Sequence, residues 1–234
     1  MRLALEAPTE GPLPDELLER LMEGLVASGI YMSYTGSSRA ASGAEHHLSH
    51  FWEMWLQLSG KPPIYHGVKV GVGSIILDKL YREFLSYSIP QQEAKQFLEQ
   101  FDEEVDRAEI AEVYGKAAPT VLADYDFQRD VRLQRLERLV QLKPKIDEEI
   151  TRMLPRLDLM KQAMFHTGAT VDWRQLPGIT AKEVRQAILR GKEIRPQYTI
   201  LQMALETRFP MDDFVDQVLR DSAELEQRQD IPIL

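Results

Sequence analysis

Histidines suited to binding a metal ion cluster in one short part of this 234-residue chain. Four of its five histidines lie between residues 46 and 66: His46, His47, His50 and His66. His46 and His50 are four residues apart, so they share one face if the segment is helical. A helical hairpin that turns at the two prolines 62–63 would return His66 beside His46. Two imidazoles on adjoining helices suit a divalent zinc or nickel ion.

Two imidazoles are too few to bind a metal ion tightly, so this pattern requires a further ligand. The chain has no cysteine, and a carboxylate is therefore expected. A catalytic site also keeps one position open for water or substrate. The spacing is not the HExxH signature of zinc proteases. An alternative stays open, in which these histidines, near Trp52 and Trp55, are partly buried polar residues with hydrogen-bond partners.

The stretch "GSSRAASG", residues 36–43, carries groups that suit a phosphate. Ser37 and Ser38 offer hydroxyl donors, and Arg39 offers a guanidinium that matches phosphate oxygens. The same residues fit an exposed loop in which Arg39 pairs with one of the many acidic side chains. Both interpretations stand, with Ser38 and Arg39 as the candidate phosphate ligands.

The elements that must position these residues are predicted to be helices. After an extended leader over residues 1–14, apolar side chains recur every three or four residues from Leu17 to Val26. Ser42 and Glu45 have the spacing of a capping box, which predicts a helix ending near Gly60. Further helices are expected at 68–85, 91–101, 107–114, 127–142, 180–191 and 211–226, with interruptions at Pro144 and Pro155. Only "TGATVDW", residues 167–173, suggests a strand.

Composition limits the classes of function. Hydrophobic residues make up 44% and charged residues 28% of the chain, as in ordinary globular proteins. The net charge of -9 argues against a nucleic-acid partner, which would require a basic surface. No apolar run approaches the length of a membrane span, and the first residues do not form a signal peptide. The sequence thus predicts a cytoplasmic protein with no membrane partner.

Two motifs together resemble a known family. The string "SGIYMSYTGSSRAASGAEHHLSHFWEM", followed by "HGVKVGVGSI", is similar to the second half of sn-glycerol-1-phosphate dehydrogenases, which belong to the iron-dependent alcohol dehydrogenase and glycerol dehydrogenase superfamily. The bacterial branch with nickel or zinc resembles it most. The later string "IRPQYTILQMALE" resembles that family's C-terminal R-x-x-Y-T-x-L segment.

The resemblance implies roles for individual residues. His46, the first of an H-x-x-x-H pair, and His66, of the H-G motif, would be metal ligands. His50 would be a catalytic group, as a proton relay or a support for the ligands. The family's ligating aspartate lies in its N-terminal half and has no counterpart in this chain. Where the family commonly reads H-G-E-x-V, this chain has Val68 in place of the glutamate.

The resemblance also implies a domain that is missing. These dehydrogenases bind NAD or NADP in an N-terminal α/β domain, and no run of alternating strands and helices precedes Asp15. The glycines at 71 and 73 are expected to let a neighbouring helix approach closely, not to bind phosphate. We therefore expect an all-α helical bundle over residues 15–234, corresponding to the C-terminal domain of the dehydroquinate synthase-like, glycerol dehydrogenase fold.

Three functions remain under consideration. The first is the metal-binding half of an enzyme that reduces dihydroxyacetone phosphate, with NAD or NADP bound only if the missing domain or a separate nucleotide-binding subunit is supplied. The second is a non-catalytic helical remnant that serves as an interaction or oligomerisation module. The third is a metal-dependent hydrolase that uses Glu45 or Asp124. Surface left open by the missing domain favours a homo-oligomer.

Overall fold

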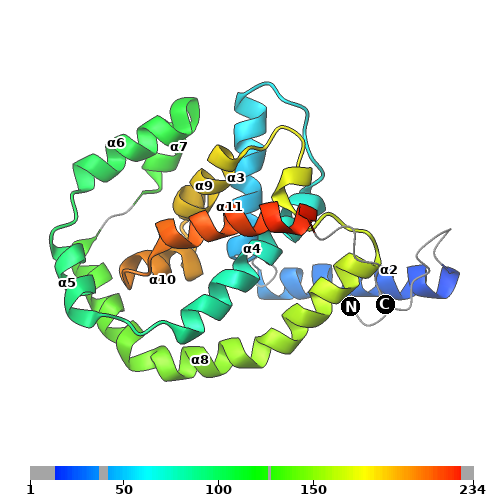
Figure 1. The fold of residues 1–234 in the computed structure, drawn as a ribbon, viewed down its shortest axis with the longest axis horizontal. Coiled ribbons are helices and arrows are strands. Elements are labelled where there is room, and N and C mark those ends of the chain that lie inside the picture. The colour runs from blue at the N-terminus through cyan, green and yellow to red at the C-terminus, as the bar shows by residue number, and fades with distance from the viewer. Residues whose placement is uncertain (1–13, 37–41, 126–127, 228–234) are drawn as a thin grey trace.

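The computed structural model describes residues 14–36, 42–125 and 128–227, which form helices joined by turns (Figure 1). No strand occurs within these ranges, so the all-α prediction is confirmed. The strand suggested for residues 167–173 is wrong, because this segment is a turn that leads into a short 3-10 helix. The helices are α2 (Asp15–Thr35), α3 (Ala44–Leu58), α4 (His66–Ser86), α5 (Gln91–Glu99), α6 (Glu103–Tyr114), α7 (Ala118–Ala123), α8 (Arg129–His166), α9 (Ala181–Arg190), α10 (Ile200–Glu206) and α11 (Met211–Gln227), with 3-10 turns η2 (Gly115–Ala117), η3 (Trp173–Gln175) and η4 (Gly191–Glu193).

The centre of the fold is the antiparallel pair formed by α3 and α4. These helices contact each other more extensively than any other two elements. Their facing apolar side chains are fully buried and include Leu48, Phe51, Trp52, Leu56, Val72, Ile76, Leu80 and Phe84. The Trp52 indole also donates a hydrogen bond of 3.2 Å to the backbone oxygen of Glu183, which ties α9 to α3. This burial fixes the position of both histidine-bearing helices.

Gly73 is the point of closest approach between these two helices. A Cβ atom at this position would lie 3.0 Å from the backbone oxygen of Glu45. At Gly71, the nearest atom would be the flexible end of Met164, at 2.9 Å. The prediction that these glycines serve helix packing is therefore confirmed, and most clearly for Gly73.

The longest helix, α8, runs through both prolines that were expected to interrupt it. Pro144 and Pro155 lie inside the helix on its exposed side. Each proline leaves one backbone carbonyl of the preceding turn without its usual donor. Packing against α4 and α5 holds the segment helical, and the helix bends as a long arc in Figure 1.

Two helix ends follow the predicted capping chemistry. The Thr180 side chain accepts from the backbone of α9, and Glu183 accepts from the Thr180 backbone at 3.0 Å, which completes the predicted capping box. Gly191 follows the last residue of α9, also as predicted. Thr199 and Gln202 form a second capping box at the start of α10, which the sequence analysis did not identify.

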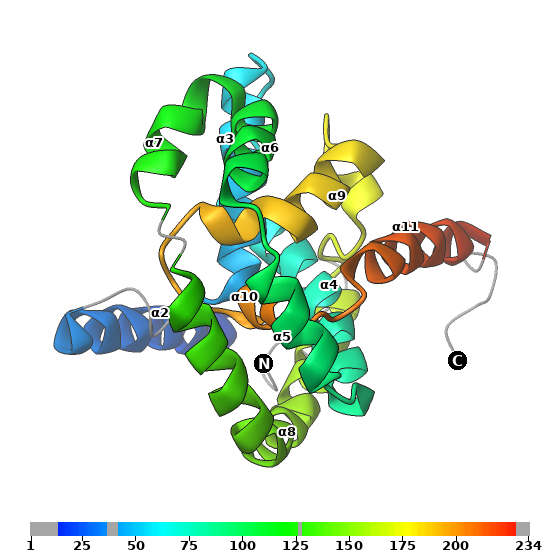
Figure 2. The ribbon, with the colours of Figure 1, turned by 90° about the vertical axis from the view of Figure 1, so that its left-hand side faces the viewer.

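Helix α2 stands apart from the rest of the described structure. It projects beyond the other helices in both ribbon views (Figures 1 and 2), and none of its residues is buried. The predicted apolar stripe is therefore exposed, with Leu25 59% and Leu21 52% accessible to solvent. Apolar surface of this kind is typical of an interface. The expected homo-oligomer stays a prediction, and the expected leader lies almost wholly outside the described residues.

None of the helices in the described ranges has both the length and the hydropathy required to cross a lipid bilayer.

Replacing Gly73 by alanine is expected to lower the free energy of unfolding by about 1 kcal/mol or more, because the new methyl group must push the two helices apart. Gly67 lies on the same helix with nothing near its Cβ position. Gly67→Ala should therefore raise the free energy of unfolding by up to about 1 kcal/mol through helix propensity alone. Urea unfolding of both variants measures the difference. Equal effects of the two substitutions would contradict the assigned role of Gly73.

Candidate metal centre

The histidine-bearing helix α3 begins at Ala44, after Gly43 in an extended conformation. The capping box predicted from Ser42 and Glu45 is wrong, because the helix starts one residue later than that spacing requires. Glu45 instead accepts a hydrogen bond from the backbone N–H of Gly43 at 2.7 Å. The same carboxylate oxygen lies 2.8 Å from His46 Nδ1, so Glu45 holds both the helix start and the first histidine.

The structure brings together the three histidines that the sequence analysis selected, His46, His50 and His66. His66 is the first residue of α4, two residues before the predicted start of this helix, and its ring lies close to both of the others. The ring centroid of His66 is 5.3 Å from that of His46 and 5.3 Å from that of His50. The centroids of His46 and His50 are 6.3 Å apart. We refer to these three residues as the histidine cluster.

Glu53 supplies a carboxylate beside the histidine cluster. It follows His50 by one helical turn, and its Oε2 lies 3.4 Å from His50 Nδ1 and 3.9 Å from His66 Nδ1. Val68, which stands where the resembled family has a glutamate, is instead half-buried and packs against the core. The carboxylate beside His66 thus comes from α3, which the sequence analysis did not identify.

Two residues of the histidine cluster, together with Glu53, provide ligand atoms that fit a divalent ion. One ligand atom each from His50, Glu53 and His66 lies within 4.8 Å of the others. A zinc ion bonded to two nitrogens and one oxygen would require these atoms slightly closer together. His66 and Glu53 are about half-exposed, so their side chains have room to move. Three protein ligands would leave a fourth position for water or substrate.

Lys69 lies beside this carboxylate and is almost fully buried. Its Nζ donates to the backbone oxygen of Ile64 at 2.8 Å and lies 3.9 Å from Glu53 Oε2. Burial lowers the pKa of the ammonium group, and the charge of Glu53 partly offsets this effect. Helical spacing of three residues, from His50 to Glu53 and from His66 to Lys69, is the sequence signal that would have found both groups.

Burial and nearby positive charge favour the neutral form of His50. Burial lowers the pKa of His50, and the charge of Arg195 lowers it further. The adjacent His47 is fully buried, and its backbone packs against Gly191 of η4. Burial lowers the pKa of His47 to about 4, an effect that its contact with the Gly191 backbone offsets only in part.

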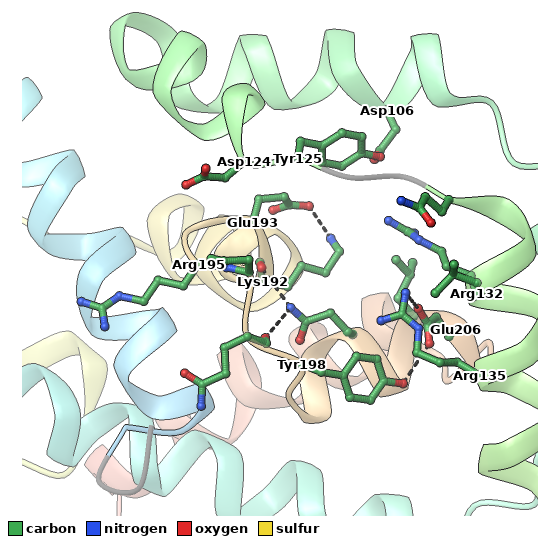
Figure 3. Close-up of a pocket in the computed structure, with 16 residues that line it drawn as sticks. Asp106, Asp124, Tyr125, Arg132, Arg135, Lys192, Glu193, Arg195, Tyr198 and Glu206 are labelled. Carbon is green, nitrogen blue, oxygen red and sulfur yellow. Dashed lines mark hydrogen bonds and ion pairs between the residues drawn. The ribbon is translucent and has the colours of Figure 1, made fainter. Parts of the chain in front are cut away.

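The remaining candidate residues do not join the cluster in the described structure. Ser38 and Arg39, the candidate phosphate ligands, lie outside the described residues, as does Ser37. Asp124 lines a separate pocket of about 280 Å³, formed by the end of α7, the first turns of α8 and residues 192–206 (Figure 3).

The metal-free protein is expected to lose stability as the pH falls from about 6.5 to about 4. Over this range the unfolded chain binds a proton at His47 but the folded chain does not, so acid favours unfolding. A pKa lowered from 6.5 to about 4 corresponds to roughly 3 kcal/mol at most. Denaturant unfolding with a chelator present, for wild type and His47→Gln, measures the slope. An equally steep slope in the variant would contradict this assignment.

Comparisons with known proteins identify relatives that match part of the chain. It is 34% identical to a glycerol-1-phosphate dehydrogenase of Bacillus licheniformis over 130 residues, which are 55% of this chain and 32% of that relative. It is 50% identical to the enzyme of that name from Geobacillus thermodenitrificans over 62 residues, 26% of this chain and 15% of the relative. It is 43% identical to the one from Pyrococcus horikoshii over 67 residues, 29% of this chain and 18% of the relative.

No family model and no solved structure matches the chain. The match spans about a third of the first of these relatives and less of the other two. The similarity and the helical fold agree with each other, because a chain that corresponds to the C-terminal helical domain of these enzymes should match them only in part. The resemblance seen in the sequence is thus confirmed: the chain is a partial relative of the glycerol-1-phosphate dehydrogenases.

Proposed function

We propose that this chain is the metal-binding part of an enzyme that interconverts dihydroxyacetone phosphate and glycerol 1-phosphate with NAD or NADP. The observation that carries this proposal is the meeting of His46, His50 and His66, with ring centroids 5.3 to 6.3 Å apart, in a chain whose relatives are named for this reaction. A helix pair packed only for stability would not require three partly exposed imidazoles at one place.

Each group has an assigned task in this proposal. In this proposal His66 and, from the family pattern, His46 hold the divalent ion. Glu53, whose carboxylate lies within 4.8 Å of the ligand atoms of His50 and His66, is the carboxylate within this chain. A bound zinc or nickel ion would supply Lewis acidity toward the carbonyl oxygen of the ketone. His50, whose lowered pKa keeps it neutral, accepts the hydroxyl proton of glycerol 1-phosphate during oxidation and returns it during reduction.

The nicotinamide cofactor requires a binding domain beyond the described helices. Dinucleotides bind at the carboxyl ends of strands in α/β domains, and the described residues form no strand. In this proposal, a fused or separate nucleotide-binding domain presents the cofactor to the histidine cluster. The phosphorylated ketone then lies between that domain and α3.

Calorimetric titration of the metal-free chain with Zn²⁺ or Ni²⁺ is expected to show one site that His66→Ala removes, because His66 adjoins both other rings. Glu53→Gln keeps the size of the side chain but loses its charge, and should weaken binding by about tenfold or more. His166→Ala, in a histidine that ends α8 outside the cluster, is the matched control. Metal binding that does not change in His66→Ala would contradict the proposed ligand.

Dehydrogenase activity is expected when the chain is fused to the N-terminal part of the Bacillus licheniformis relative. Oxidation of NADH or NADPH should depend on dihydroxyacetone phosphate and on added metal, and His66→Ala should reduce the rate at least a hundredfold. His50→Gln should lower kcat more than it changes metal affinity, because His50 moves a proton. A folded, metal-loaded fusion without turnover would instead favour the non-catalytic remnant.

A further inference from the structure

The segment "IRPQYTIL" contains a motif whose role the proposed function leaves open, and most of its residues have structural tasks. Tyr198 donates a hydrogen bond of 2.8 Å to the buried carboxylate of Glu206. Thr199 caps α10, and Leu201 is fully buried in the core. The guanidinium of Arg195, in contrast, forms no hydrogen bond or ion pair with the described residues, so it does not stabilise the fold in this way.

The backbone that carries Arg195 is held firmly against α3. The amide nitrogen of Gln202 donates to the backbone oxygen of Lys192 at 3.0 Å and to that of Gln197 at 2.9 Å, so one side chain links both ends of the loop. Gln197 donates in turn to the backbone oxygen of Ser42 at 2.7 Å, at the entry to α3. Pro196 restricts the backbone next to Arg195. These bonds place the loop beside the helix that bears His46 and His50.

The guanidinium of Arg195 points away from the neighbouring pocket and toward α3 (Figure 3). Three other basic residues of this region bind carboxylates: Arg190 pairs with Asp106, Lys192 with Glu193 and Arg135 with Glu206. Arg195 forms no hydrogen bond or ion pair with any residue that the structure describes. In a chain with 37 acidic residues and 28 lysines and arginines, a partly buried arginine without a carboxylate partner is available for another anion.

The side chain of Arg195 extends toward α3, the helix that bears His46 and His50 (Figure 3). The hydrogen bond from Gln197 to the Ser42 backbone holds the loop of Arg195 at the entry to this helix. An anion bound by Arg195 would therefore lie within reach of the groups to which the proposed function assigns the chemistry.

We propose that Arg195 binds the phosphate of the substrate next to the histidine cluster, as the charged residue of the R-x-x-Y-T-x-L motif. A guanidinium can donate two parallel hydrogen bonds to phosphate oxygens, which fixes orientation as well as charge. Arg195 would thus hold the phosphate end of the molecule while its carbonyl end faces His50 and His66. This inference rests on the proposed function for the identity of the substrate, and it assigns a phosphate ligand within the described structure in addition to Ser38 and Arg39.

The test is calorimetric titration of the full metal-free chain with glycerol 1-phosphate and with inorganic phosphate, in a chelator. Wild type is expected to bind both, and Arg195→Gln at least tenfold more weakly. Arg195→Lys, which keeps the charge but loses the paired donors, should fall between them. In parallel, glycerol 1-phosphate should shift the ring proton signals of His50 in NMR spectra of wild type and leave them unchanged in Arg195→Gln.

Arg220→Gln is the matched control, since it removes the same charge from an exposed arginine on α11. It should bind phosphate as wild type does. Arg195→Gln should keep the melting temperature and the zinc affinity of wild type, which separates a lost phosphate ligand from a lost fold or a failed metal site. Equal phosphate binding by Arg195→Gln and wild type would overturn the proposal, as would a wild type that binds neither probe. Loss of zinc binding in wild type would instead contradict the proposed function.

Discussion

The close contact of α3 with α4 is the constraint on which the proposed site depends. Gly73 lets the backbones of α3 and α4 approach so closely that a Cβ atom at this position would lie 3.0 Å from the backbone oxygen of Glu45. The hairpin then places the first residue of α4, His66, opposite the middle of α3, where His50 and Glu53 project one turn apart. Buried side chains such as Trp52 and Leu80 make this arrangement stable, and the polar site occupies the open end of the same interface.

Much of this arrangement was readable in the sequence because it arises from local rules. Spacing of four residues between His46 and His50, and prolines before His66, predicted a shared face and a hairpin, and the rings do meet. The capping box at Thr180 was equally local. The errors came where tertiary packing overrides local preference. Helix α8 continues through Pro144 and Pro155 because its inner face packs against other helices while the prolines face water.

The groups that the sequence did not reveal act across helices. Glu53 lies on α3, and only the folded hairpin brings it near His66. Lys69 is a buried ammonium beside that carboxylate. Helical spacing puts Glu53 and Lys69 each on the same helix face as a histidine, but their contact with each other forms only when α3 packs on α4. Arg195 lies 145 positions after His50 in the chain, and reaches α3 only through the bonds that Gln202 and Gln197 make. Long-range contacts of this kind turn a recognisable motif into a candidate site.

X-ray absorption spectroscopy of the zinc-loaded chain would test the central claim most directly, since it reports the atoms bound to the metal. The account predicts a first shell of nitrogen and oxygen at about 2.0–2.2 Å, with the outer-shell scattering of at least two imidazoles. His66→Ala should lose this imidazole signal, because the variant no longer holds the ion at the histidine cluster. A shell of oxygen alone, or a spectrum identical in wild type and variant, would mean that the histidine cluster does not hold the metal.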